Sequence, residues 1–203
     1  MPKLSEPQIE ARKRLVEDAA LAQFKTRGFH GTGLRDIAKE AGVSLGNIYN
    51  YYPGKEALFD SLLARLQADF AGGDSPLAAY FATCTFPDDL EALGHAIGGM
   101  VREHGDYLTL IYVDLAEFSG KHVRPHYASL QERFREALGA RAEAPLPGGH
   151  DPVTAFLTVY MQFFNFFIVE RMIGAQGHLG LDQDAAVAAI AAIFRRGLGP
   201  ERP

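Results

Sequence analysis

Amide and phenol side chains crowd into residues 47–51, where the sequence reads NIYNY. The amides of Asn47 and Asn50 can each pair with the edge of an adenine base, whereas the hydroxyls of Tyr49 and Tyr51 can reach phosphates. Side chains of these types in so short a segment are suited to holding a nucleic acid by hydrogen bonds.

Residues suited to catalysis or metal binding form weaker patterns elsewhere. His122 and His126 have the four-residue spacing of a metal pair on one helix face, but Pro125 lies between them and no third ligand is evident. Cys84 has no convincing His or Asp partner in the sequence, which also lacks P-loop, GxSxG and zinc-ligand motifs. We therefore expect no enzyme activity, no cofactor and no bound metal.

Two short helices joined by a tight turn are predicted for residues 34–51. The first has an apolar stripe at helical spacing, made by Leu34, Ile37, Ala38 and Ala41. Gly42 can adopt the left-handed conformation that ends a helix, and Ser44 is a good N-cap for the next one. With Val43 and Ile48 filling the angle, this pattern indicates a helix-turn-helix, whose second helix enters the DNA major groove.

Nearly every other segment also predicts a helix, and none shows the alternation of a strand. The expected helices cover about residues 6–28, 55–70, 88–104, 106–118, 121–138, 151–172 and 182–197, which with the two short ones makes about nine. Helix starts are indicated by Ser5 with Gln8, Asp88 with Glu91, Asp151 before Pro152, and Asp182. We expect an all-α fold.

Composition narrows the class of protein without naming a partner. The net charge of −5 argues weakly against nucleic acid, although residues 1–60 carry +1 and the remainder −6. A single cysteine excludes an internal disulfide and suits a reducing cytoplasm. The N-terminus has no apolar signal segment, and the nearest approach to a membrane span, residues 155–169, is shorter than the ~20 residues required. We expect a cytoplasmic protein with no membrane partner.

The stretch from Arg14 to Leu63 resembles the TetR-like one-component transcriptional repressors. Its most specific parts are Gly28-Phe29, Asp36-Ile37-Ala38, Ala41-Gly42-Val43-Ser44, Ile48-Tyr49, Tyr51-Tyr52 and Lys55-Glu56-Ala57-Leu58. The rest of the chain matches only as a helical body of suitable length. The resemblance implies a three-helix DNA-binding domain over residues 1–53 and a helical effector-binding and dimerisation domain over residues 54–203.

The resemblance also implies which residues contact double-stranded operator DNA. Arg35 would contact it from the start of the second helix, Lys55 would meet a phosphate, and the recognition surface would consist of Ser44, Leu45, Gly46, Asn47, Tyr49, Asn50 and Tyr51. Lys3, Arg12, Lys13 and Arg14 would add phosphate attraction. Leu45 and Gly54 depart from the family pattern, which commonly has a polar or basic residue and a capping Ser or Asn there. The alternatives are that Tyr51 only packs, that Asn50 is only solvated and that Lys55 pairs with a carboxylate.

Two segments of the body predict a homodimer. A helix over residues 156–169 would be apolar nearly all round and must be covered on several sides, by its own domain and by a partner. The last helix carries a stripe of small and apolar residues. The expected four-helix interface consists of Phe156, Phe164, Ala186, Ala189, Ile190, Ile193, Phe194 and Gly197.

In the architecture that the resemblance implies, several helices of the body surround a ligand cavity. Candidate lining residues are Met100, His104, Tyr107, Ile111, Tyr112, Phe118, Tyr127, Tyr160, Phe163 and Phe167. Such a lining favours a small hydrophobic effector, such as an acyl chain or an aromatic compound. The alternative is that these residues are simply core. Gly94, Gly98 and Gly99 either permit tight packing or leave room for a ligand.

The sequence thus predicts a homodimeric repressor that binds palindromic DNA and is released by its effector. One alternative is a helix-turn-helix activator or adaptor protein. Another is an all-α ligand carrier in which the apparent DNA-binding segment is only a packing motif.

Overall fold

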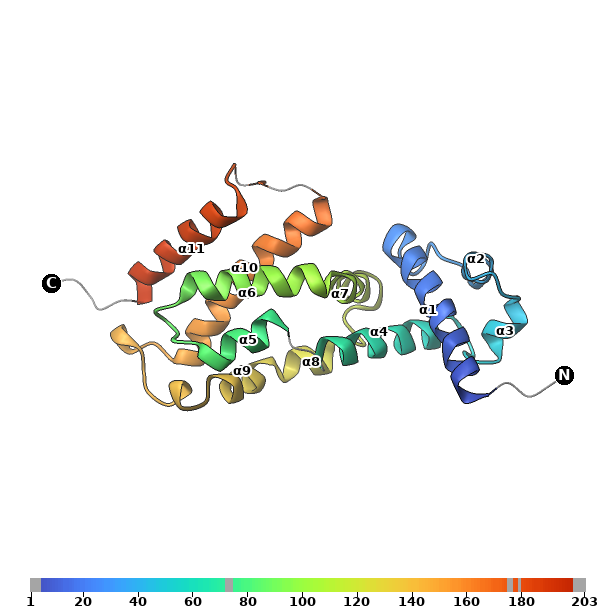
Figure 1. The fold of residues 1–203 in the computed structure, drawn as a ribbon, viewed down its shortest axis with the longest axis horizontal. Coiled ribbons are helices and arrows are strands. Elements are labelled where there is room, and N and C mark those ends of the chain that lie inside the picture. Colours follow the sequence, from blue (N-terminus) through green and yellow to red (C-terminus); the bar gives the residue numbers. More distant parts are fainter. Residues whose placement is uncertain (1–4, 72–74, 175–176, 179, 199–203) are drawn as a thin grey trace. The chain divides into compact units, whose positions relative to one another are not determined.

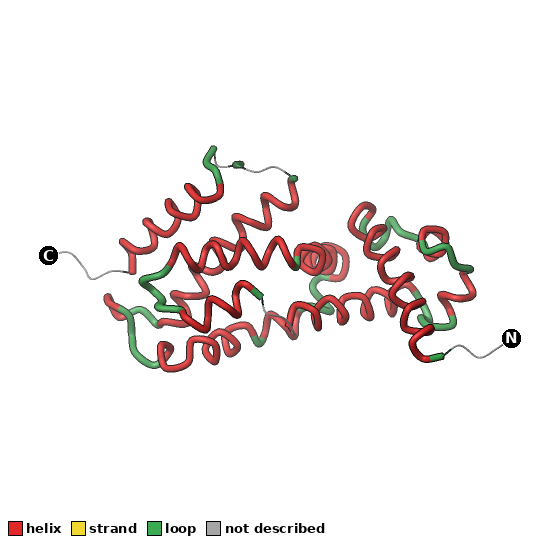
Figure 2. Tube along the Cα trace, in the orientation of Figure 1, coloured by secondary structure: helices red, strands yellow, loops and turns green. Residues whose placement is uncertain are grey.

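The computed structural model describes residues 5–71, 75–174, 177–178 and 180–198, and all regular structure in these ranges is helical (Figures 1 and 2). The helices are α1 (Glu6–Arg27), α2 (Leu34–Glu40), α3 (Leu45–Tyr49), α4 (Lys55–Ala71), α5 (Pro76–Thr83), α6 (Leu90–Glu103), α7 (Gly105–Phe118), α8 (Arg124–Ala128), α9 (Leu130–Leu138), α10 (Pro152–Ile173) and α11 (Gln183–Leu198), with 3₁₀ turns at Gly139–Ala142 and Pro147–Gly149. The prediction of an all-α fold is confirmed.

The chain forms two compact units. The N-terminal unit comprises residues 1–72 and 106–124, and the C-terminal unit comprises residues 73–105 and 125–203. The N-terminal unit therefore contains α4 and nearly all of α7 in addition to the helix-turn-helix. The sequence-based boundary after residue 53 separates a DNA-binding domain from an effector-binding and dimerisation domain. That division of functions stays a prediction.

The core of the N-terminal unit forms where α1 packs against α2 and α4. Phe24 of α1 and Phe59 of α4 are fully buried, and their ring centroids lie 5.5 Å apart. Ile37 of α2 and Ile48 of α3 are also fully buried. Burial of each such side chain contributes about 1.5–3 kcal/mol, so these contacts hold two helices that are too short to be stable alone.

The C-terminal unit is built around α6 and α10, with α11 packed against both, α5 against α6, and α9 against α10. Glycines allow the close approach of α6 to α10. A Cβ atom added at Gly94 would lie 2.8 Å from the Phe163 ring, and one added at Gly98 would lie 2.7 Å from the Phe167 ring. The glycines of α6 therefore serve tight packing.

By length and composition, α10 is the one helix among the described residues that can cross a bilayer, with a mean hydropathy of 1.5 over its most apolar stretch. However, 61% of that stretch is buried inside the protein. A core helix surrounded by other helices has the same composition. Because α6, α9 and α11 all pack against α10, its apolar surface is explained by the fold.

Several predicted caps are confirmed. The Ser5 N–H donates to the Gln8 side chain at 3.0 Å, and the Asp151 carboxylate accepts the Thr154 N–H at 2.7 Å. The Asp182 carboxylate accepts the Ala185 N–H at 2.8 Å. These hydrogen bonds stabilise the N-terminal ends of α1, α10 and α11, because each one pairs a backbone N–H group that has no partner within the helix.

Other predicted boundaries are wrong. The box of Asp88 with Glu91 does not form, because α6 begins at Leu90 and the Asp89 carboxylate instead accepts the Thr85 N–H at 2.6 Å. The helix predicted for residues 121–138 begins only at Arg124 and is divided into α8 and α9. Helix α5 was not predicted, although Ser75 caps it by accepting the Ala78 N–H at 3.1 Å.

Candidate DNA-binding site

The turn between α2 and α3 has the geometry that its residues predict. Gly42 has a φ of +65°, and the Val43 N–H donates to the Ala38 carbonyl at 3.0 Å. The Ser44 hydroxyl accepts the Asn47 N–H at 3.2 Å and so caps α3. Because no atom lies within 4 Å of a Cβ built at Gly42, the left-handed backbone alone requires glycine there.

The recognition segment, residues 44–51, has an inner face, which the following residue Tyr52 extends, and an outer face. Ile48 and Tyr52 are buried, whereas Tyr49 has 54% of its surface exposed. The predicted DNA-contacting residues on the outside are Arg35, Ser44, Gly46, Tyr49 and Asn50, which are exposed, and Leu45, Asn47, Tyr51 and Lys55, which are half-buried. A Cβ atom at Gly46 would meet only the Ser44 hydroxyl oxygen, at 3.9 Å, so the backbone of α3 is accessible there.

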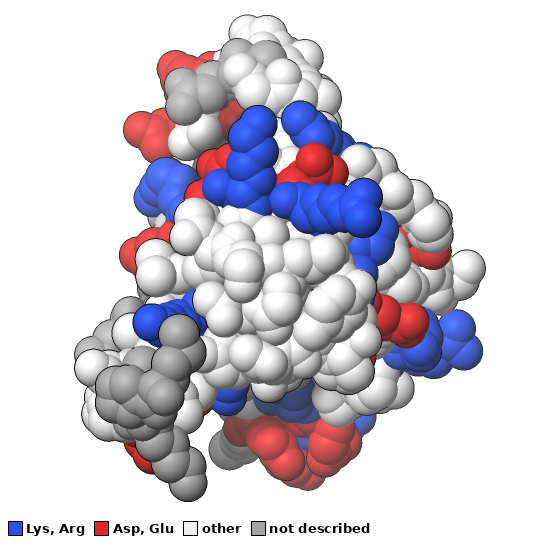
Figure 3. Space-filling view, turned by 90° about the vertical axis from the view of Figure 1, so that its right-hand side faces the viewer, with Lys and Arg blue, Asp and Glu red and all other residues white. Residues whose placement is uncertain are grey.

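Charge is not concentrated at the centre of this face. Figure 3 shows a broad uncharged area with Lys and Arg atoms gathered along one side of it. Exposed basic residues of the N-terminal unit include Arg12, Arg14, Arg35 and Lys39. Lys13 pairs with Glu10 at 2.9 Å, and Lys3 lies outside the described residues. The unit thus presents uncharged hydrogen-bonding groups together with separate basic side chains.

Lys55 has a structural role in addition to the predicted one. Its ammonium donates to the carbonyls of Phe29 and Thr32, both at 2.6 Å, and lies 4.2 Å from the centroid of the Phe29 ring. These contacts tie the start of α4 to the loop between α1 and α2. The partners are carbonyls, so the alternative of a carboxylate partner is not what the structure shows. An ammonium has three donors, and contact with a phosphate stays a prediction.

Glu117 of α7 holds the same loop and was missed by the sequence interpretation. Its carboxylate accepts the N–H groups of Phe29 at 2.8 Å and His30 at 2.6 Å, and it lies 2.6 Å from Nδ1 of His30. A Cβ atom at Gly28 would overlap this carboxylate. Burial raises the pKa of Glu117, but the hydrogen bonds from His30 and Phe29 outweigh it and lower the pKa below its usual value.

A family model described as bacterial regulatory proteins, tetR family, matches residues 17–62, which contain α2, α3 and the start of α4. Residues 17–62 therefore belong to the TetR family of helix-turn-helix transcriptional regulators. It is 45% identical over 58 residues to the transcriptional regulator RutR of Escherichia coli K12, covering 29% of this chain and 27% of RutR. It is 30% identical over 131 residues to the transcriptional repressor SCO4008 of Streptomyces coelicolor, covering 64% of this chain and 63% of that protein.

These curated relatives are matched over less than two thirds of their own length. A solved TetR-like transcriptional regulator from Rhodococcus sp. RHA1 matches more completely, with a TM-score of 0.63 over 98% of both chains at 21% identity. That likeness shows the fold, with the N-terminal helix-turn-helix and the helical body. A family of regulators also agrees with the prediction that the chain is not an enzyme.

The two histidines that have the spacing of a metal pair contact different partners. His122 lies between carboxylates, with Nδ1 against the fully buried Asp114 and Nε2 2.9 Å from Asp60. His126 contacts Arg133, and burial, with Arg133 as the second cause, lowers its pKa. Across the described part of the chain, no group of three His, Cys, Asp or Glu residues can hold a metal ion.

The predicted ligand-binding residues are mostly packed into the cores of the two units. In the N-terminal unit Tyr107 and Ile111 are buried and Tyr112 and Phe118 are half-buried; in the C-terminal unit Met100, Tyr160, Phe163 and Phe167 are buried, His104 is half-buried and Tyr127 is exposed. The Tyr160 hydroxyl lies 3.8 Å from the Met100 sulfur. These contacts agree with the alternative that many of the residues are core.

Phe167 also lines a groove of about 330 Å³ in the C-terminal unit. The other lining residues are Gly98, Val101, Arg102, Glu170, Arg171, Gly174 and Gln183. Glu170 is almost fully buried and accepts hydrogen bonds from the Gly177 N–H at 2.7 Å and the Gln183 side chain at 2.9 Å. The groove therefore combines apolar positions of α6 and α10 with charged side chains of the same two helices and with Gln183 of α11.

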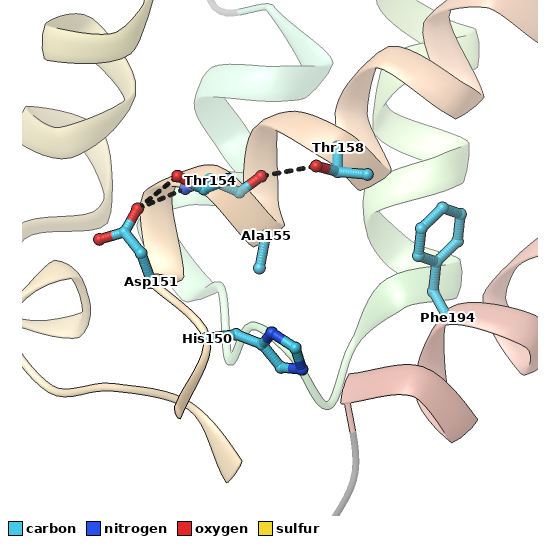
Figure 4. A pocket seen from close by; sticks show the side chains of 6 residues that line it. All are labelled: His150, Asp151, Thr154, Ala155, Thr158 and Phe194. Atoms are coloured by element: carbon cyan, nitrogen blue, oxygen red, sulfur yellow. Dashed lines mark hydrogen bonds between the residues drawn. The ribbon is translucent and has the colours of Figure 1, made fainter. Parts of the chain in front are cut away.

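The predicted dimer residues divide into buried and accessible groups. Phe156, Ala186 and Ile190 are buried inside their own unit, so they offer almost no surface to a second chain. Ile193 is 69% exposed, Ala189 and Gly197 are exposed, and Phe164 and Phe194 are half-buried. Phe194 also lines a groove of about 260 Å³ with His150, Asp151, Thr154, Ala155 and Thr158, shown in Figure 4.

Proposed function

We propose that this TetR-family chain is a cytoplasmic homodimeric repressor that binds palindromic operator DNA and is released by a small hydrophobic effector. The observation that carries the proposal is the division of the recognition segment. Ile48 and Tyr52 anchor it from inside, while Tyr49, Asn50 and Gly46 face outward with no other part of the unit covering them. That arrangement suits a short helix whose outer face enters a major groove.

Dimerisation is supported by the outer surface of α10 and α11. Ile193 is 69% exposed and Met161 is 37% exposed, and the groove beside Phe194 in Figure 4 is lined by Ala155 as well as by polar side chains. A second copy would cover this surface and place a second recognition segment on the same duplex. Two-fold symmetry of the protein would then match the symmetry of a palindromic site.

The effector is proposed from the aromatic interior of the body and the groove at Phe167. Two solved relatives guide the choice of probes. FadR from Bacillus halodurans is described as a fatty acid degradation regulator, and KstR2 of Mycobacterium tuberculosis as a ketosteroid transcriptional regulator. An acyl chain and a steroid are therefore the first compounds to test for release of DNA.

The central experiment is selection of duplexes by the full chain from a random pool, followed by anisotropy titration. We expect enrichment of an inverted repeat, two chains bound per duplex, and affinity that falls as salt rises. Alanine at both Asn47 and Tyr49 should weaken binding to the enriched duplex at least tenfold, since a good base contact contributes about 1–3 kcal/mol. Substitution of exposed Arg141 by alanine is the control, because it lies in the C-terminal unit.

No enrichment, or unchanged affinity in the Asn47 and Tyr49 variant, would overturn the proposal and favour a ligand carrier. A footprint over the promoter supports a repressor, whereas one upstream of the polymerase site favours an activator.

A further inference from the structure

A carboxylate is buried in the N-terminal unit, away from the outer face of the recognition segment. Glu17 of α1 has only 5% of its surface exposed. Its Oε1 accepts the hydroxyl of Tyr52 at 3.0 Å and the hydroxyl of Ser61 at 2.8 Å. Its Oε2 forms an ion pair with Nε of Arg65 at 3.2 Å. One carboxylate thus joins α1, the residue that follows the recognition segment, and two positions of α4.

Burial of a carboxylate costs free energy unless its oxygens are paired with an opposite charge and hydrogen-bonded. Arg65 supplies the opposite charge and is itself held by Asp18 at 2.7 Å. Burial, followed by the charge of Glu17, raises the pKa of Tyr52, so its hydroxyl keeps the proton that it donates. Hydrogen bonds are directional, and the cluster therefore fixes orientation as well as distance.

Tyr52 directly follows the recognition segment, so the orientation of its side chain affects the position of that segment. Helix α3 spans only Leu45–Tyr49, too short to be stable by itself, so its flanks determine its position. On one side Ser44 caps it. On the other, the Tyr52 N–H donates to the Ile48 carbonyl at 2.9 Å, and the Tyr52 side chain, 4% exposed, reaches Glu17.

We propose that Glu17 and Tyr52 are positioning residues for base recognition, because their hydrogen bond fixes the rotation of the recognition segment against α1 and α4. This inference rests on the proposed DNA-binding function. Neither side chain touches the DNA. Loss of the bond leaves the exposed amides and phenols present but wrongly aimed, so discrimination between sequences falls while attraction to phosphates remains.

The test compares Tyr52→Phe with Tyr80→Phe. Both remove the hydroxyl of a buried tyrosine that donates to a carboxylate, since Tyr80 donates to Asp89 at 2.9 Å in the C-terminal unit. For each full-length variant, anisotropy gives the Kd for the enriched duplex and for a scrambled duplex of equal length at the same salt. Circular dichroism sets an assay temperature at which both are folded.

The specificity ratio is the Kd for the scrambled duplex divided by the Kd for the enriched duplex. We expect this ratio to fall about tenfold in Tyr52→Phe, the size of a lost base contact, and to be unchanged in Tyr80→Phe. Glu17→Gln keeps an oxygen that accepts the Tyr52 hydroxyl and should preserve most of the ratio, whereas Glu17→Leu should not. Ser61→Ala, which removes one donor and leaves the Tyr52 bond, is expected to resemble Glu17→Gln and serves if Tyr52→Phe does not fold.

An unchanged ratio in folded Tyr52→Phe, or an equal fall in Tyr80→Phe, would overturn the inference and leave only a structural role. If Ser61→Ala is the variant used, a ratio as low as that of Glu17→Leu overturns it as well. Absence of any sequence preference in the unmodified protein would instead overturn the proposed function itself.

Discussion

The two compact units bury polar side chains to different extents. Among the described residues, the buried polar or charged side chains are Glu17, Thr32, Asp114 and Glu170, and the first three lie in the N-terminal unit. Both units contain packed aromatic rings; in the C-terminal unit the centroid of Phe134 lies 5.0 Å from that of Phe156 and 4.8 Å from that of Tyr160.

That difference follows from what hydrogen bonds and apolar contacts can each specify. Hydrogen bonds fix direction, whereas apolar packing fixes volume and tolerates exchange of one apolar side chain for another of similar size. A unit that must present a few donors in fixed positions gains from buried polar contacts. The C-terminal unit, in which Glu170 is the one buried charged side chain among the described residues, depends more on apolar packing.

The largest effect should come from deleting a central ring of the C-terminal unit. Phe163 is fully buried against Gly94, so Phe163→Ala should lower the free energy of unfolding by about 3–5 kcal/mol in urea titration. Phe164→Ala, at a half-buried neighbour, is the matched control and should cost less. Equal losses would mean that the ring of Phe163 adds no more to the core than its neighbour.

In the N-terminal unit the buried polar residue to compare with Phe163 is Asp114. Its carboxylate accepts the N–H groups of His122 and Val123, both at 3.2 Å, besides facing the His122 ring. Asp114→Ala leaves these groups without an acceptor and should cost about 3 kcal/mol in the same titration. Asp60→Ala removes the exposed carboxylate on the other side of the ring and should cost below about 1 kcal/mol. A cost for Asp114→Ala no larger than that would contradict a polar core.

Two glycines with nearly the same φ, one in each unit, allow the units to be compared. Gly42 and Gly174 have φ values of +65° and +64°, and neither has an atom within 4 Å of a built Cβ. Alanine at either should cost about 1–2 kcal/mol of stability because of left-handed strain. Only Gly42→Ala should weaken DNA binding, since Gly42 sets the angle between α2 and α3. A similar loss of affinity in Gly174→Ala would break the distinction.

The smallest effect is a change of pH dependence at Glu117. Its pKa is lowered from the usual 4.5, so its stabilising contribution is present above that value and is lost as the pH falls through the lower folded pKa. Glu117→Gln should therefore flatten the fall in unfolding free energy between about pH 5 and pH 3. Glu132→Gln, at an exposed residue in the C-terminal unit, should keep the original slope. Identical slopes for all three proteins would show that Glu117 does not gain from its backbone donors.

Short-range features of this chain follow from its residues, because the physical causes lie within a few positions. Ser44 caps the helix three residues ahead, Gly42 supplies the left-handed turn, and Asp151 starts α10. The helical class and the position of the recognition segment could therefore be predicted. The failures at Asp88 and at residues 121–123 occur where distant groups, Tyr80 for Asp89 and Asp114 for the turn, compete with the local pattern.

Long-range contacts required the folded chain. No spacing in the sequence connects Glu117 with Phe29, which are 88 residues apart, or Glu17 with Tyr52, which are 35 apart. The same holds for the C-terminal unit, where Phe163 and Ile193 are both expected on buried or dimer-facing helix surfaces but one is fully buried and the other is 69% exposed. Local propensity and capping act within one helical turn, whereas burial and carboxylate partners depend on which helices meet, and that is a property of the whole fold.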